Sequence, residues 1–263
     1  MVSFVRKAIL APERGSHPRG VVRSLLLQPR LFDLASAYLQ YRDSRRRSQI
    51  SDARTGVTDD HFRKVFDYNA GVTLQKDVTT SRRAEVFYQV LALPPRDLTN
   101  EKLLIVGPRN VQELFMAYLY GFSWSNIQGI DLYSTNPRIR VMNMEAMEFP
   151  DATFDAVCMS NTFGYAKDPF RCLSETARVL KPGGRFAFGA NHVPDDKNWP
   201  ANLLSADDVR GMLQKVSLRA YYEQRFEKVN ALGLQQTTIN FGVIKALPAT
   251  KSPAEVAPPS PSA

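Results

Sequence analysis

The sequence predicts an α/β fold in which a mostly parallel sheet carries helices on both faces. From Lys102 onward, short apolar segments alternate with segments of helical periodicity, which is typical of repeated strand–helix units. Within residues 103–113, LLIVGPRNVQE, four apolar residues end at Gly107 and a helix-like run follows. A glycine at such a corner lets the backbone approach a ligand closely, and the helix start offers free N–H groups. These residues are the predicted ligand cradle.

The elements of this α/β part follow from apolar runs and turn residues. Strands are expected at residues 103–106, 127–131, 138–142, 154–159 and 184–190. Helices are expected at residues 111–120, 169–180 and 207–216. Gly121 ends the first helix, and residues 181–184, KPGG, form a stop and a turn before the last of these strands. Residues 218–228 and 236–245 are two extended segments that we expect to pair antiparallel.

The N-terminal part is expected to be a helical extension that covers the open end of the sheet. Residues 1–20 mix arginine, proline and glycine without a period and are predicted to be unstructured. A helix is expected within residues 21–41, with Pro29 marking a break or a start, and a second, short helix is expected after an N-cap at residues 58–60. A third helix is expected at residues 81–93, where two prolines end it.

The chain therefore divides into four predicted parts. A flexible basic N-terminus spans residues 1–20, and the helical extension spans residues 21–98. The α/β domain spans residues 99–246, and residues 247–263 form a Pro/Ala/Ser-rich tail that is expected to be disordered.

Composition excludes several classes of protein. Two cysteines are too few for a disulfide framework, and the three histidines lack metal-ligand spacing, so no metal site is predicted. No apolar run is long enough for a membrane-spanning helix. A cytoplasmic, reducing location is expected.

The positive charge is concentrated in the N-terminal arm. The chain has a net charge of +8, and residues 1–50 hold ten Arg and Lys against three acidic residues, a balance of +7. Cations at the end of the helix near residue 41 suit its dipole. Alternatively, the basic arm lies at the surface of an anionic membrane, binds RNA or an acidic partner, or belongs to a transit peptide.

One segment carries a resemblance to a known family. Residues 149–190 read FPDATFDAVCMSNTFGYAKDPFRCLSETARVLKPGGRFAFGA. The segment resembles the class I S-adenosylmethionine-dependent methyltransferases of type 11, because Phe149-Pro150, Phe154-Asp155, Asp168, Glu175 and residues 178–184 occur in that family's order. The resemblance covers roughly residues 100–245 and implies a Rossmann-like sheet of seven strands with the last strand antiparallel.

The resemblance also implies S-adenosyl-L-methionine as the cofactor and assigns its contacts. The expected cofactor-binding residues are Gly107, Pro108, Arg109, Asp131, Leu132, Asn143, Met144, Ser160 and Asn161. The loop at Gly107 departs from the family pattern, since Ile105 stands where an acidic residue is usual and only one glycine remains.

Each assigned contact has a chemical reason and a structural alternative. Asp131, 24 residues beyond Gly107, would accept hydrogen bonds from two ribose hydroxyls. Asn143 and the Met144 N–H would contact adenine. Arg109 would pair with the methionine carboxylate or, at i,i+4 spacing, with Glu113. Residues 160–162 lie at the mouth where cofactor and acceptor should meet, or else they cap the next helix.

The expected activity is methyl transfer, for which alignment of the reactants supplies much of the rate. His192 is the best placed candidate for a general base, and Tyr165 and Asp195 are weaker ones. The acceptor is a small molecule, a sugar or a lipid-linked compound that aromatic residues of the extension would contact, although these aromatics also suit core packing: Phe62, Phe66, Tyr68 and Tyr88.

Three other functions stay open. The chain could be an inactive interaction module with a methyltransferase fold, which the altered glycine loop favours. It could also be an RNA methyltransferase that uses its basic arm. A nicotinamide-dependent dehydrogenase is less favoured, because the three-glycine fingerprint is absent.

Overall fold

The computed structural model describes residues 18–44, 51–52, 60–75, 82–134, 136–194, 203–230 and 232–247. Its centre is a seven-stranded sheet with the strand order β5-β3-β2-β6-β7-β9-β8. The strands are β2 (Leu103–Val106), β3 (Ile127–Asp131), β5 (Ile139–Val141), β6 (Phe154–Met159), β7 (Leu180–His192), β8 (Leu218–Val229) and β9 (Gln235–Lys245). The pairs from β5 to β7 are parallel, whereas β9 runs antiparallel to both β7 and β8. The predicted Rossmann-like fold class is confirmed.

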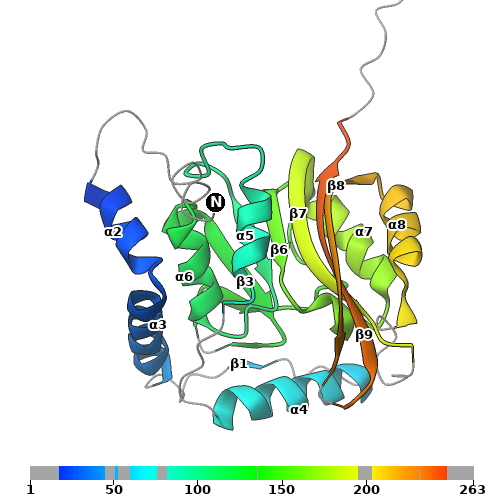
Figure 1. The fold of residues 1–263 in the computed structure, drawn as a ribbon, viewed down its shortest axis with the longest axis horizontal. Coiled ribbons are helices and arrows are strands. Elements are labelled where there is room, and N and C mark those ends of the chain that lie inside the picture. The colour runs from blue at the N-terminus through cyan, green and yellow to red at the C-terminus, as the bar shows by residue number, and fades with distance from the viewer. Residues whose placement is uncertain are drawn as a thin grey trace, which may run out of the picture.

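Helices cover both faces of this sheet (Figure 1). α5 (Glu85–Leu91) and α6 (Val111–Leu119) pack on the face that contains Leu103 and Ile105. α7 (Pro169–Val179) and α8 (Ala206–Lys215) pack on the face that contains Leu104 and Val106. Because both faces are buried, β2 is an unbroken apolar run rather than an alternating one.

The N-terminal extension packs outside α6. It begins with α2 (Pro18–Leu26) and α3 (Pro29–Ser44), so α3 starts at the predicted proline and α2 starts within the segment that was expected to be unstructured. The rings of Phe32 and Phe115 stack with their centroids 6.0 Å apart and join α3 to α6. The other predictions for the termini concern residues 1–17 and 248–263, which lie outside the described residues.

α4 (Asp60–Gln75) lies across one edge of the sheet (Figure 1). It is longer than the short helix that the sequence predicted, and the rest of its predicted cap, Thr58 and Asp59, lies outside the described part of the chain. Phe66 meets Tyr133 edge to face, with ring centroids 6.1 Å apart. Nearby, β1 (Ser51–Asp52) pairs with β4 (Tyr133–Ser134), which follows β3. Contacts distant in sequence thus fix the extension at the carboxyl end of β3.

The KPGG segment differs from its prediction. It was expected to separate α7 from a strand that starts at Gly184, but β7 already begins at Leu180. Leu180 pairs with Phe154 and Arg185 with Ala156, so the residues between them bulge out of the ladder. An ion pair of 2.7 Å between Lys181 and Asp155 holds this bulge to β6.

None of the helices in the described residues is long and apolar enough to cross a membrane.

Candidate functional site

A cavity of about 420 Å³ opens at the carboxyl ends of the parallel strands. Its walls come from the residues after β2, β3, β5 and β6, from the first turn of α6 and from α4. All nine predicted cofactor contacts line it: Gly107, Pro108, Arg109, Asp131, Leu132, Asn143, Met144, Ser160 and Asn161. The fold therefore brings together residues that are far apart in the sequence, and their roles stay predictions.

Gly107 is required by the geometry of its loop. Its φ is +70°, and a Cβ at this position would lie 2.0 Å from Thr162 Oγ1. Thr162 in turn donates a hydrogen bond of 3.1 Å to the Val106 carbonyl. The ends of β2 and β6 can meet this closely only because the side chain is absent.

Arg109 and Asn110 lead the chain into α6. Arg109 also has a positive φ, +54°, and its N–H donates to Asp131 Oδ2 at 3.1 Å. Asn110 caps α6, because its side-chain oxygen accepts from the Gln112 N–H at 2.9 Å. The single-glycine loop therefore keeps an ordered turn and a capped helix start.

Asp131 ends β3 and points its carboxylate into this loop. Oδ2 accepts from the Arg109 N–H and Oδ1 from the Leu132 N–H, the latter at 2.7 Å. Burial raises the pKa of Asp131 to about 6, although these N–H groups favour the ionised form. The carboxylate retains lone pairs for two vicinal hydroxyls, which is the predicted role.

Glu113 is a cavity residue that the sequence analysis considered only as an ion-pair partner of Arg109. It lies in the first turn of α6, and Ser160 Oγ donates to its Oε2 at 3.1 Å. Burial raises the pKa of Glu113 to about 7, while the Ser160 hydrogen bond and the charges of Arg109 and Arg83 oppose this shift. A signal was available, because Glu113 is a charged residue in the first turn of the helix that follows the predicted ligand cradle.

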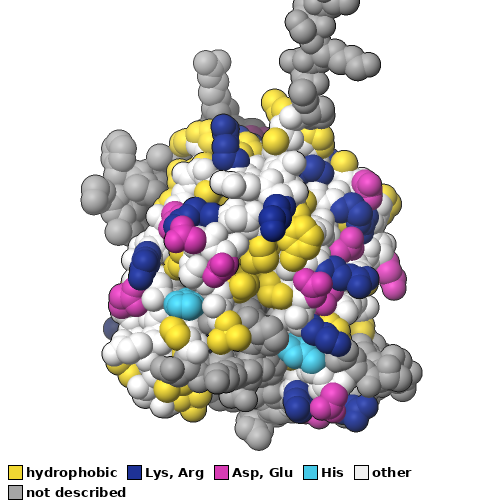
Figure 2. Space-filling view, turned by 90° about the vertical axis from the view of Figure 1, so that its right-hand side faces the viewer, with side chains coloured by type: hydrophobic (Ala, Val, Ile, Leu, Met, Phe, Trp, Pro, Cys, Tyr) yellow, Lys and Arg dark blue, Asp and Glu magenta, His cyan; other side chains and the backbone are white. Residues whose placement is uncertain are grey.

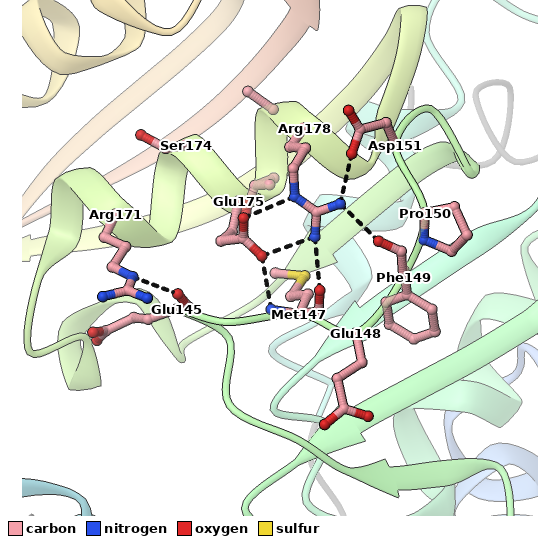
Figure 3. A network of polar contacts seen from close by, with 12 residues as sticks. Glu145, Met147, Glu148, Phe149, Pro150, Asp151, Arg171, Ser174, Glu175 and Arg178 are labelled. Carbon is pink, nitrogen blue, oxygen red and sulfur yellow. Dashed lines mark hydrogen bonds and ion pairs between the residues drawn. The ribbon is translucent and has the colours of Figure 1, made fainter.

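Asn143 and Met144 begin a loop after β5 that α7 holds in place. The Asn143 side-chain oxygen accepts from the Glu145 N–H at 2.8 Å, and its second lone pair stays available to a ligand. Farther along the loop, Arg171 Nε donates to the Glu145 carbonyl at 2.8 Å (Figure 3).

Arg178 lies at the centre of a hydrogen-bond network between α7 and this loop (Figure 3). Its guanidinium donates to Glu175 at 2.8 and 2.9 Å, to the carbonyls of Phe149 and Met147 at 2.7 Å each, and to Asp151 at 2.8 Å. Glu175 also accepts from the Met147 N–H at 2.7 Å, and the hydrogen bond to Arg178 lowers its pKa. Glu175 and Arg178, which carry part of the family resemblance, thus shape the loop and do not line the cavity.

The candidate bases lie in different surroundings. His192 ends β7 but does not line the cavity, and its buried Nδ1 has no hydrogen-bond partner among the described residues. Tyr165 does line the cavity, and its carbonyl lies 3.0 Å from Nε2 of His61 on α4. Asp195 lies outside the described residues. Of the two described candidates, Tyr165 therefore lies on the cavity wall and His192 does not, and their roles stay predictions.

The predicted aromatic group is divided. Phe62 lines the cavity, while Phe66 and Tyr88 are buried in the packing. The side chain of Tyr68 lies outside the described part. No set of three or more His, Cys, Asp or Glu side chains in the described ranges is placed to hold a metal ion.

Comparisons with known proteins agree with this geometry. Residues 120–188 match the family model described as a methyltransferase domain. No curated protein matches the chain in sequence.

Solved structures share the fold at low sequence identity. Geranyl diphosphate C-methyltransferase from Streptomyces coelicolor A3(2), in complex with Mg²⁺, geranyl diphosphate and S-adenosyl-L-homocysteine, is 16% identical with a TM-score of 0.51, over 62% of this chain and 78% of that one. The 1,6-didemethyltoxoflavin-N1-methyltransferase from Burkholderia thailandensis, with bound 1,6-didemethyltoxoflavin and S-adenosylhomocysteine, is 13% identical with a TM-score of 0.50, over 71% and 87%. The [4+2]-cyclase SpnF is 15% identical with a TM-score of 0.51, over 64% and 81%.

The family match lies within the described α/β part, and the strand order and the antiparallel β9 complete the family's sheet. Residues 120–188 therefore match a methyltransferase domain, and the chain has the fold of the class I S-adenosylmethionine-dependent methyltransferases.

Proposed function

We propose that the chain is an enzyme that binds S-adenosyl-L-methionine in this cavity and transfers its methyl group to a small-molecule, sugar or lipid-linked acceptor. One observation carries the proposal: four separate segments place all nine predicted contacts around a single cavity of about 420 Å³. This volume is in the range of small-molecule sites, roughly 300–1,000 Å³.

The residues present fit the cofactor. Asp131 offers a carboxylate to the ribose hydroxyls, and Asn143 with the Met144 N–H offers an acceptor and a donor to adenine. At Gly107 a Cβ would clash with Thr162, so only glycine lets the loop after β2 pack against the residues that follow β6. The methionine portion would lie between this loop and Ser160.

S-adenosylmethionine supplies a methyl group activated by a positively charged sulfur. The protein has to align the acceptor with that methyl group and to exclude water, and α4 closes the cavity with Phe62 and Val65. An acceptor that loses a proton needs a general base. Tyr165 lines the cavity and is the proposed base.

The related structures support a small acceptor. Two of them carry geranyl diphosphate and 1,6-didemethyltoxoflavin with S-adenosylhomocysteine. In this chain a second cavity of about 540 Å³ shares Phe62 and Asn143 with the first. Lys167 and Arg171 line this second cavity together with Glu145 and Asp168, so it suits a polar acceptor.

Titration calorimetry with S-adenosylhomocysteine tests the proposal. We expect micromolar binding by the wild type and binding about 30-fold weaker in Asp131→Ala, because about 2 kcal/mol of charge-assisted hydrogen bonding is lost. Glu148→Ala, an exposed carboxylate that does not line the cavity, should bind like the wild type. A wild type that releases no heat at high ligand concentration would favour the inactive interaction module instead.

The [4+2]-cyclase among the related structures shows that this fold also carries another reaction. Cofactor binding alone therefore does not establish methyl transfer. Incubation of the protein with methyl-labelled cofactor and a fractionated cell extract should yield a labelled product, and Asp131→Ala should abolish it.

A lipid-linked acceptor is supported by the surface of α2 and α3. Seven large apolar side chains are exposed there, between 42% and 70%: Val21, Val22, Leu25, Leu31, Leu34, Tyr38 and Tyr41. Those of α3 recur every three or four residues and form one stripe, while Phe32 is buried against α6. On the side of the molecule that carries α8, by contrast, basic and acidic side chains are interspersed (Figure 2).

We infer that this stripe docks on an anionic lipid surface. The N-terminal 50 residues carry a charge of +7, which complements anionic lipid and would repel the same face of a second copy. The cytoplasmic location also stays a prediction.

Co-sedimentation with phosphatidylserine vesicles tests the docking. Leu34→Glu should weaken binding about tenfold, because an apolar contact of about 1.5 kcal/mol is replaced by a repelled charge. Leu232→Glu, equally exposed on the β8–β9 turn, is the matched control. The RNA methyltransferase would be favoured if the wild-type protein did not bind vesicles but bound RNA. That RNA binding should be salt-sensitive and should be lost on deletion of residues 1–50.

A further inference from the structure

We propose that Glu113 binds the α-ammonium group of S-adenosylmethionine, so that the amino-acid end of the cofactor lies against the first turn of α6. The inference rests on the proposed function and adds a residue that was not among the predicted contacts.

The contacts of Glu113 leave one oxygen for a ligand. The side chain lines the cavity, and Ser160 Oγ donates to Oε2. Oε1 accepts no hydrogen bond from any residue that the structure describes. An ionised carboxylate that is partly removed from water is costly unless a cation or a donor faces it. This oxygen therefore marks a place for a positively charged ligand group.

The other acidic groups of the cradle are less suited to this task. Both carboxylate oxygens of Asp131 already accept backbone N–H groups, at 3.1 and 2.7 Å. Ile105, where the family pattern has an acid, is fully buried and aliphatic and offers no acceptor. Glu113 thus supplies a negative charge to the glycine-loop side of the cavity from the helix instead of from the strand.

The cofactor carries two positive groups, and the chemistry distinguishes them. Methyl transfer removes the charge of the sulfonium, so a carboxylate held against the sulfur would stabilise the ground state more than the transition state. The ammonium keeps its charge throughout the reaction. An ion pair between Glu113 and the ammonium therefore adds binding without opposing the chemical step.

The charged neighbours of Glu113 complete a site for an amino acid. Arg109 and Arg83 line the same cavity, and their charges favour ionised Glu113 while they suit the cofactor's carboxylate. Asp131 opposes ionisation. Tyr88 donates from α5 to the Glu113 carbonyl at 3.0 Å, and Cys158 on β6 holds a thiol whose pKa burial raises. Within the described residues, Glu113 is the charged group here that titrates closest to neutrality, with a pKa of about 7.

Calorimetry with two ligands tests the assignment. S-adenosylhomocysteine carries the amino-acid end, and 5′-methylthioadenosine keeps the adenosine and the thioether but lacks it. Glu113→Gln should weaken binding of S-adenosylhomocysteine at least 20-fold and change that of methylthioadenosine less than twofold. Asp131→Ala, the matched control, should weaken both ligands. Urea unfolding of each variant verifies that it is folded.

The pH dependence gives an independent readout. A cation binds ionised Glu113 best, so wild-type affinity for S-adenosylhomocysteine should fall several-fold from pH 8 to pH 6. The affinity of Glu113→Gln should depend much less on pH, and so should that of the wild type for methylthioadenosine.

Three results would overturn the inference. Equal weakening of both ligands in Glu113→Gln would mean that the residue acts on the whole cavity. With S-adenosylmethionine titrated as a third ligand, weakening confined to it would identify the sulfonium as the partner of Glu113. Unchanged binding of S-adenosylhomocysteine in the variant refutes the Glu113 assignment alone, whereas a wild type that binds none of these ligands refutes the proposed function with it.

Discussion

Two loops at the ligand edge of the sheet are built in opposite ways. The loop after β2, from Gly107 to Asn110, is held by backbone groups that contact Thr162 and Asp131. The loop after β5 is held by side chains of α7, above all by the five hydrogen bonds of Arg178 (Figure 3). The family resemblance is dense in the residues that brace the second loop and sparse in the first. Supporting residues therefore identify the fold, while the residues around the ligand have to identify the activity.

Removal of the brace should have the largest effect. Arg178→Ala leaves the Glu175 carboxylate and the carbonyls of Met147 and Phe149 without their donor. Because the guanidinium is partly exposed, we expect a loss of about 2–4 kcal/mol in unfolding free energy, together with weaker cofactor binding.

Urea unfolding measures this loss. Arg225→Ala, which breaks an exposed ion pair with Glu227 on β8, should change stability by less than about 0.5 kcal/mol. If the two variants were equally stable, the network would not brace the loop.

Addition of one methyl group to the glycine loop should have the next largest effect. Gly107→Ala places Cβ against Thr162 at a positive φ, so we expect a destabilisation of about 1–3 kcal/mol and loss of S-adenosylhomocysteine binding. The double variant Gly107→Ala, Thr162→Gly removes the clashing side chain and should recover part of the stability in urea unfolding.

Gly211→Ala on α8 is the control for this substitution. A Cβ there meets no atom within 4 Å, and alanine favours a helix by about 0.5–1 kcal/mol, so this variant should be slightly more stable than the wild type. Equal behaviour of the two glycine variants would show that the cradle tolerates a side chain.

The smallest effect should be a gain of stability at the ligand site. In the folded protein without ligand, burial raises the pKa of Glu113 to about 7. The folded protein therefore binds the proton of the Glu113 carboxyl group more tightly than the unfolded chain does. The contribution of Glu113 to unfolding free energy is therefore highest below about pH 4.5 and decreases as the pH rises to about 7.

Glu113→Gln removes the cost of burying an ionised carboxylate. It should therefore stabilise the ligand-free protein by about 1–2 kcal/mol at pH 8, but hardly at pH 4.5. Thermal unfolding at the two pH values measures the difference. Glu148→Gln on the surface should change little at either pH. Destabilisation of Glu113→Gln at pH 8 would contradict a carboxylate that is held for a ligand.

The sequence alone predicted the central strands well. β2, β3 and β6 have the bounds that the sequence predicted, because strands in the middle of a sheet covered on both faces are rich in apolar residues. β7 was predicted too short, since the pairing of Leu180 with Phe154 across a bulge is not visible in the KPGG motif. The pairing of β1 with β4 joins residues about 80 positions apart and has no local signal.

Residue types and spacing thus determined the fold class and the position of the cradle, and the family resemblance supplied its nine candidate contacts. Only the tertiary structure placed Glu113 beside Ser160, left His192 out of the cavity lining and put α4 on the cavity wall. The physical reason is that apolar periodicity is encoded locally. The desolvation of a carboxylate, and the direction in which it points, depend instead on which segments pack around it, and at LLIVGPRNVQE those segments come from α5, β3 and β6.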